Sequence, residues 1–185
     1  MRVIIGAGQS RYDGWLSTQE DDLDFLTLES WNQLTKPDSI DALLAEHVWE
    51  HLTYNEGAVA AKHCYQYLKP GGYIRCAVPD KNFRNDWYQQ MVQVGGPGPA
   101  DQPAASHKVV YDAKTFVSVF EGAGFEVTLL EYCKENGDFQ YTYWNEMDGM
   151  IGRSLRFDTR NSTNKLGMLS IIIDAKKPLL IRNNS

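Results

Sequence analysis

Cysteine is scarce in this sequence, and its number and spacing do not suggest pairing. The 185 residues include three cysteines, at Cys64, Cys76 and Cys133. An odd number at wide spacing argues against the disulfide framework of small secreted domains. We therefore expect buried free thiols and a cytoplasmic protein. The start of the chain agrees, because residues 1–5 run into a strand-like segment rather than a signal peptide.

Long apolar runs and clusters of basic residues are also lacking. No apolar stretch approaches the ~18 residues of a membrane span, so we expect no membrane insertion. The net charge is -6, and the largest basic cluster is Lys176-Lys177. Because nucleic-acid binding requires clustered Lys and Arg, nucleic acid is not an expected partner. The length suits one domain, placed at residues 1–176, with a C-terminal tail at 177–185.

A strand–helix–strand unit between residues 40 and 80 dominates the pattern. Residues 40–45 form an apolar strand, residues 55–67 carry apolar side chains at helical spacing, and residues 73–78 form a second strand. Lys69-Pro70-Gly71-Gly72 stops the helix, since proline cannot continue it and the glycines supply a turn. Such a unit predicts parallel strands that end at one edge of an α/β sheet, where ligands bind.

The remaining elements follow from the same patterns. Further strands are predicted at residues 3–5, 14–18, 24–28, 125–132 and 168–175, with a hairpin extension at 139–144. Helices are predicted at 29–34, 82–94 (with Trp87 in the core) and 113–121, a mobile loop at 95–106, and a polar excursion with Arg153, Arg156 and Arg160 at 150–164. Only residues 9–13 separate the first two strands, too few for the usual crossover helix.

Several motifs together resemble a known enzyme family. The segments Ala45-Glu46-His47-Val48-Trp49-Glu50-His51-Leu52, Leu68-Lys69-Pro70-Gly71-Gly72 and Val78-Pro79-Asp80 are similar to class I S-adenosylmethionine (SAM)-dependent methyltransferases. The nearest group is the small bacterial predicted SAM-dependent methyltransferases, of the methyltransferase type 11 kind. This resemblance implies a Rossmann-like sheet, mostly parallel with an antiparallel final strand and shortened at its amino-terminal end. It also implies SAM as cofactor and methyl transfer to an unknown acceptor.

The expected cofactor residues lie where strands end. Gly6, Ala7 and Gly8 follow the first strand, and glycine lets the backbone approach a ligand closely. In the family an acidic residue after the second strand holds the ribose. Here Gln19 occupies that position and Glu20 follows one step later, so either residue is a candidate. Glu46 and His47, after the strand at 40–45, are expected to line the cofactor pocket.

A hydroxyl or amine acceptor requires a base, because its proton must leave during methyl transfer. The candidates are His107, His47 and Asp80, all expected near the same sheet edge. His107 is preferred, since an unperturbed histidine titrates near neutral pH. Because no helices precede the first strand, we expect a site that is either open enough for a large substrate or covered by a second subunit. We expect a small-molecule acceptor in preference to a macromolecule, and a homodimer whose second subunit covers the site is a further hypothesis.

One motif suggests metal binding instead. His47-Val48-Trp49-Glu50-His51 matches H-x-x-E-H, a zinc-peptidase pattern. That pattern requires a helix and a third ligand elsewhere, whereas these residues follow a strand. We therefore expect that the protein binds neither zinc nor any other metal.

Two alternatives to catalysis by methyl transfer stay open. The first is a non-catalytic domain that keeps the fold with weak or lost SAM binding, favoured by the missing crossover helix and by Gln19. The second is a nicotinamide-dependent oxidoreductase. Arg11 argues against it, because the dinucleotide fingerprint requires a third glycine there.

Overall fold

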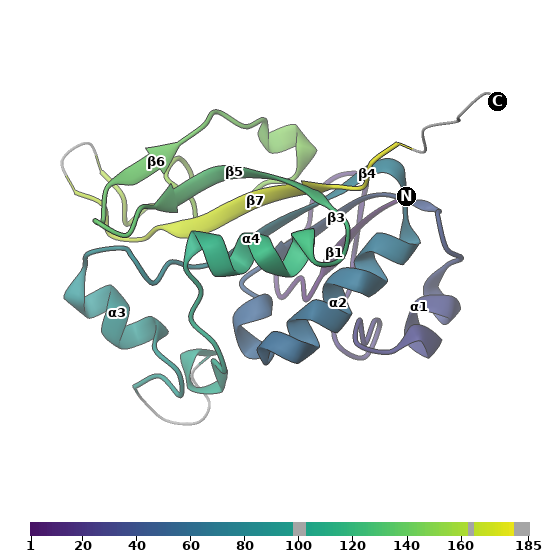
Figure 1. The fold of residues 1–185 in the computed structure, drawn as a ribbon, viewed down its shortest axis with the longest axis horizontal. Coiled ribbons are helices and arrows are strands. Elements are labelled where there is room, and N and C mark those ends of the chain that lie inside the picture. The colour runs from purple at the N-terminus through teal and green to yellow at the C-terminus, as the bar shows by residue number, and fades with distance from the viewer. Residues whose placement is uncertain (98–102, 163–164, 180–185) are drawn as a thin grey trace.

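The computed structural model describes residues 1–97, 103–162 and 165–179, and a seven-stranded sheet runs through its centre (Figure 1). The strand order is β2-β1-β3-β4-β7-β5-β6. The strands are β1 (Arg2–Ile5), β2 (Trp15–Ser17), β3 (Ile40–Glu46), β4 (Leu68–Pro79), β5 (Glu126–Cys133), β6 (Phe139–Tyr141) and β7 (Ser170–Lys176). The pairs among β2, β1, β3 and β4 are parallel, whereas β7 and β6 pair antiparallel with their neighbours. The predicted fold class, with its antiparallel final strand, is confirmed.

Side chains along each strand point alternately to the two faces of the sheet, so the apolar core has a cluster on each face. Val3 and Ile5 of β1 belong to the larger apolar cluster, while Ile4 between them belongs to a second cluster on the opposite face. This is the period-two pattern of a sheet that is buried on both sides. The larger cluster is covered by α1 (Leu28–Leu34), α2 (Tyr54–Tyr67) and α4 (Ala113–Glu121), which lie on one side of the sheet (Figure 1).

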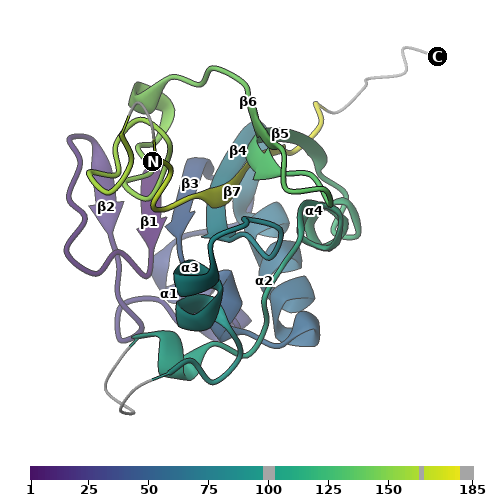
Figure 2. The same cartoon turned by 90° about the vertical axis from the view of Figure 1, so that its left-hand side faces the viewer.

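The opposite face is covered without a long helix. The described residues of the segment 142–168 pack there, with Trp144 and Ile151 buried against Ile4 and Leu44. Among the described residues of this segment, the helical structure is one short turn, η3 (Glu146–Asp148). Figure 2 shows the segment running above β1 and β7. This arrangement leaves the face beside β1 and β3 available for a cavity.

The strand–helix–strand prediction is confirmed, and local chemistry explains its boundaries. Thr53 and Glu56 form a capping box, in which each side chain accepts from the other residue's backbone N–H, and this fixes the start of α2. The helix ends at Tyr67. The chain then enters β4 directly, and the extra residues around Gly71 (φ +83°) form a bulge, seen as a register shift against β3.

Two predicted features are wrong. Residues 24–28 are not a strand, because the Asp24 carboxylate accepts from Leu26 N and the Asp24 carbonyl accepts from Thr27 N, which closes a turn. The chain continues into α1 at Leu28. Trp87 is not in the core either: it is 55% exposed, because α3 (Asp86–Val92), which begins after its cap at Asn85, buries Tyr88 and Val92 instead.

Other predictions are confirmed in whole or in part. No helix occurs between β1 and β2, so this crossover is a turn. Cys64, Cys76 and Cys133 are buried free thiols. Part of the predicted loop at 95–106 and of the excursion at 150–164 lies outside the described residues. The first residue of the predicted C-terminal tail packs against the domain. Lys177 is buried, and its Nζ donates to Asp38 and to two backbone carbonyls. Within the described part of the chain, no helix has the length and apolar character to cross a membrane.

Candidate active site

The chain turns sharply after β1, at the glycines of the predicted cofactor loop. Gly6 and Gly8 have φ of +58° and +52°, which glycine adopts without strain. The Gln19 side chain closes the turn: its Nε2 donates to Gly8 O at 2.9 Å, and its Oε1 accepts from Gly8 N at 3.3 Å. Gln19 is therefore occupied by the loop and lines neither of the two cavities at this sheet edge.

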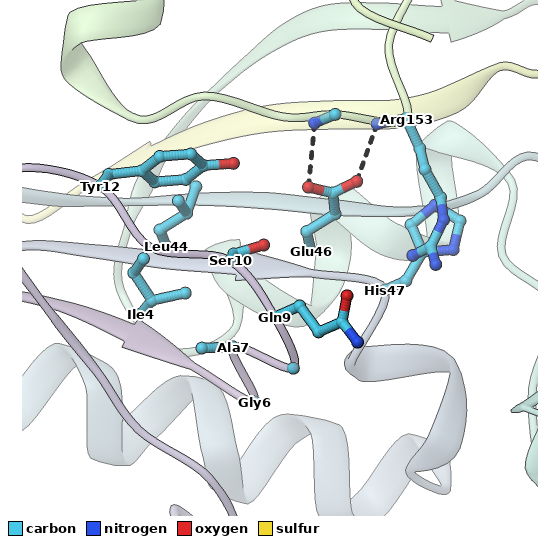
Figure 3. Close-up of a pocket in the computed structure, with 12 residues that line it drawn as sticks. Ile4, Gly6, Ala7, Gln9, Ser10, Tyr12, Leu44, Glu46, His47 and Arg153 are labelled. Carbon is cyan, nitrogen blue, oxygen red and sulfur yellow. Dashed lines mark hydrogen bonds between the residues drawn. The ribbon is translucent and has the colours of Figure 1, made fainter. Parts of the chain in front are cut away.

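A cavity of about 770 Å³ opens beside this turn (Figure 3). Ile4 and Leu44, from the face without long helices, form its apolar floor. Its other lining residues are Gly6, Ala7, Gly8, Gln9, Ser10, Tyr12, Glu46, His47, Gly152 and Arg153. Burial raises the pKa of Tyr12, so this side chain presents a neutral hydroxyl. The larger cavity thus combines an apolar floor with polar walls.

Glu46, at the end of β3, anchors one wall of the larger cavity. Its Oε2 accepts from Gly152 N at 3.0 Å, and its Oε1 accepts from Arg153 N at 2.7 Å. The carboxylate thereby ties the 142–168 segment to the sheet edge, as the dashed lines in Figure 3 show. The Arg153 side chain lines the cavity beside His47. In the sequence, Arg153 was recognisable only as part of a polar segment. No pattern indicated that this segment packs against the end of β3.

A second cavity, of about 450 Å³, lies on the helix-covered face of the same edge. Glu20 contributes a carboxylate, and Leu23, Phe25 and Leu26 contribute apolar surface. Val48, His51, Leu52 and Lys108 complete the far side, together with Asp24. Gly6 and His47 line this smaller cavity as well as the larger one. The two cavities therefore adjoin the same two residues, which follow β1 and β3.

His47 occupies an unusual backbone conformation at this junction. Its φ is +56°, a region that residues other than glycine rarely adopt and that is often found at functional sites. The ring lies between two partners: Nδ1 is 3.1 Å from Glu50 Oε1, and Nε2 is 2.9 Å from Ser170 Oγ. Burial acts to raise the pKa of Glu50, but the His47 ring, a backbone hydrogen bond and the nearby His51 together lower the pKa of that carboxyl.

The other two predicted proton acceptors lie away from both cavities. Asp80 is fully buried, and its carboxylate accepts from Asn82 N at 2.8 Å and Cys133 N at 2.6 Å. Burial raises the pKa of Asp80 in spite of these bonds. His107 is also buried, with Nδ1 3.0 Å from Val92 O. Of the three candidates, His47 is the one that the structure places at the cavity edge.

Comparison with known proteins gives a consistent answer. A family model described as a methyltransferase domain matches residues 9–130. A SAM-dependent methyltransferase structure from Archaeoglobus fulgidus is 16% identical, with a TM-score of 0.55, covering 95% of this chain and 86% of its own. One from Methanosarcina mazei is 14% identical, with a TM-score of 0.52 and coverage of 92% and 71%.

A third structure contains a partner. It is a Haloferax volcanii complex between the Trm112 methyltransferase activator and a methyltransferase, 13% identical, with a TM-score of 0.52 and coverage of 96% and 81%. No curated protein matches this chain. At these identities the structural similarity establishes the fold, and the family match spans most of the chain. The chain belongs to the methyltransferase domain family.

Proposed function

We propose that this protein transfers a methyl group from SAM to a small-molecule acceptor, and that the transfer takes place where the two cavities adjoin. The observation that supports this most directly is the sharing of Gly6 and His47 by both cavities. Two ligands bound on opposite faces of the sheet edge would meet beside these residues. Methyl transfer needs this arrangement, because its rate depends mainly on aligning donor and acceptor.

The chemistry of the smaller cavity favours the adenosine part of SAM. Glu20 offers a carboxylate that can accept hydrogen bonds from both ribose hydroxyls. Leu23 and Phe25 provide apolar surface for the adenine ring. Of the two predicted ribose ligands, Glu20 is the better candidate. The Gln19 side chain is already hydrogen-bonded to both the N–H and the carbonyl of Gly8.

The acceptor would then enter the larger cavity, whose volume of about 770 Å³ suits a small molecule. His47 is assigned the role of proton acceptor. Its two ring nitrogens have different partners: Nδ1 faces Glu50 Oε1 at 3.1 Å, and Nε2 is 2.9 Å from Ser170 Oγ. Because the Ser170 hydroxyl donates to Arg153 O at 2.7 Å, it accepts from Nε2 in the structure, so Nε2 acts as the base only after the ring has lost this proton and the Ser170 hydroxyl has turned away. We also propose that the protein is cytoplasmic, which is consistent with its buried free thiols. A homodimer is a further part of the proposal.

Binding of S-adenosylhomocysteine (SAH) to two glycine variants tests the cofactor site. Gly8 and Gly14 both have positive φ, and a Cβ atom at either position meets no other atom within 4 Å. Asparagine tolerates this backbone conformation, so Gly8→Asn and Gly14→Asn should both fold. Gly8→Asn places a side chain in the larger cavity beside the glycine turn, where the methionine part of SAM would have to reach the acceptor, and should abolish SAH binding in calorimetry. Gly14→Asn, whose position lines neither cavity, should bind as the wild type does.

Parallel titrations separate the alternatives. Wild-type protein that binds neither SAM nor SAH would support a non-catalytic domain, and binding of NADH in their place would support an oxidoreductase. Equal SAH affinity in the wild type and Gly8→Asn would show that the glycine turn is not the cofactor site.

A further inference from the structure

Glu50 is a buried carboxylate that pairs with the His47 ring and still has hydrogen-bonding capacity to spare. It lies in the turn η1 (Trp49–His51) and has no exposed surface. Neither carboxylate oxygen accepts a hydrogen bond of good geometry, although His47 Nδ1 lies within 3.1 Å of Oε1. Leaving a buried charge without hydrogen bonds is costly. The side chain therefore calls for a further cationic partner.

Two histidines face this carboxylate from different parts of the chain. His51 follows Glu50 directly, and His107 arrives from the segment before α4. One ligand atom from each of Glu50, His51 and His107 lies within 4.8 Å of the other two. His107 Nε2 is 4.0 Å from Glu50 Oε1, and the two imidazole rings meet edge to face at 5.0 Å between centroids.

Hydrogen bonds fix which nitrogen of His107 is available. Its Nδ1 lies 3.0 Å from Val92 O. A carbonyl oxygen only accepts, so Nδ1 carries the proton and Nε2 directs its lone pair towards Glu50. Histidines that bind metals commonly donate their second nitrogen to a carbonyl in this way, which holds the ring in place.

The backbone brings His107 to this position independently of its side chain. Lys108 N and Val109 N both donate to the carbonyl of Glu50, at 2.8 and 3.2 Å. The neighbouring Lys108 ammonium pairs with Glu56 at 3.1 Å, so this cation is directed away from Glu50. The cluster is thus held by main-chain bonds, and among the described residues no lysine or arginine pairs with its carboxylate.

We propose that Glu50, His51 and His107 bind a divalent transition-metal ion, with Zn²⁺ as the best match. Two imidazoles and one carboxylate are a donor set that zinc uses when a fourth position stays open. Zinc–ligand bonds near 2.0–2.1 Å place tetrahedral ligand atoms about 3.4 Å apart, so a modest side-chain movement closes the site. His51 lines the smaller cavity, which gives an ion and its fourth ligand a path from solvent.

This site differs from the zinc-peptidase pattern considered in the sequence. That pattern pairs His47 with His51 and requires a helix and a third ligand. Because neither is evident in the sequence, no metal was predicted there. In the structure, Glu50 and His51 come from the turn, and the missing ligand is His107. His47 contacts the carboxylate oxygen from outside the ligand set. The inference does not rest on the proposed methyl transfer.

Zinc titration of chelator-treated protein tests the inference. We expect calorimetry to find about one Zn²⁺ per chain, and Zn²⁺ to raise the thermal midpoint, since a ligand that binds only the folded state stabilises it. His107→Gln and Glu50→Gln should weaken zinc binding by roughly a hundredfold or more, at least as much as loss of a supporting residue. His51→Gln, at the half-buried position, is the variant least prone to misfolding.

His63→Gln is the matched control, because the His63 ring bonds Phe25 O and lies outside the cluster. It should bind zinc like the wild type. Circular dichroism and urea unfolding establish that each variant is folded. Absence of zinc binding by the wild type overturns the inference. So does an equal loss in His63→Gln and His107→Gln, or unchanged affinity in a folded His51→Gln variant. SAH titration of the same samples reports separately on the methyltransferase proposal.

Discussion

Substitution of Arg75 is the sharpest test of how the 142–168 segment is held on the sheet face that has no long helix. This side chain of β4 is 2% exposed, and its guanidinium makes four hydrogen bonds of 2.8 Å. Nε and Nη2 donate to the two oxygens of Asp174 on β7, and Nη1 donates to the carbonyls of Asn145 and Gly149. It also lies 4.9 Å from the Trp144 ring centroid. One buried cation thus joins two strands to the 142–168 segment.

The cost of removing this cation can be estimated from its partners. Arg75→Met keeps the apolar stem but leaves one carboxylate and two carbonyls without their donor. Deleting one member of a fully buried ion pair typically costs about 3–5 kcal/mol. The Asp174 side chain is 29% exposed, so water can partly replace the guanidinium. We therefore expect the lower end, about 3 kcal/mol of unfolding free energy.

Urea denaturation of the wild type and Arg75→Met measures this loss as a lower midpoint at constant slope. Lys69→Met is the matched control, because the Lys69–Asp41 pair is about half exposed on both sides, and such pairs contribute under about 1 kcal/mol. If Arg75→Met lost less than 1 kcal/mol, or no more than Lys69→Met, the reasoning that this bond network anchors the segment would be refuted.

Two further predictions concern the cofactor and pH. Glu20→Ala should weaken SAH binding about tenfold, equivalent to ~1.4 kcal/mol, whereas Gln19→Glu should not tighten it; the opposite calorimetric result would assign the ribose to Gln19. Burial raises the pKa of Glu131, although Trp144 Nε1 and Leu155 N both donate to it. A raised folded-state pKa means that folding favours the protonated form, so stability falls as pH rises from the unfolded-state value of ~4.3 through the folded-state pKa. Urea midpoints across this range should fall more in the wild type than in Glu131→Gln, and equal slopes would contradict the assignment.

The sequence predicted most of the sheet, because its strands carry their information locally. The run at 40–45 and the stop after Tyr67 depend on nearby residues, and both are found as expected. The predicted strand at 24–28 is wrong because Asp24 bonds to its own neighbours in a turn, which a pattern of apolar residues does not record. Trp87 is exposed because α3 packs Tyr88 and Val92 inward instead, and the spacing of neighbouring apolar residues does not distinguish these two faces of the helix.

The sequence predicted the candidate site residues that follow parallel strands, but not the contacts that distant segments make with them. Gly6, Gly8, Glu20, Glu46 and His47 meet at one edge because β1, β2 and β3 are parallel, so the fold alone brings them together. Contacts between distant segments could not be predicted in this way. Nothing in the sequence indicates that Arg153 returns to the end of β3, or that His107 approaches Glu50.

The helix-free face also suggests how specificity could change within such a fold. Three charged side chains of the sheet, Glu46, Arg75 and Glu131, hold the 142–168 segment, largely through its main-chain groups. Main-chain bonds are insensitive to most substitutions in the segment itself. Side chains that face the larger cavity, such as that of Arg153, can therefore vary while the segment keeps its position. Acceptor choice would then reside in a part of the chain that is separate from the glycine turn and from Glu20, which is how one cofactor site can serve different substrates.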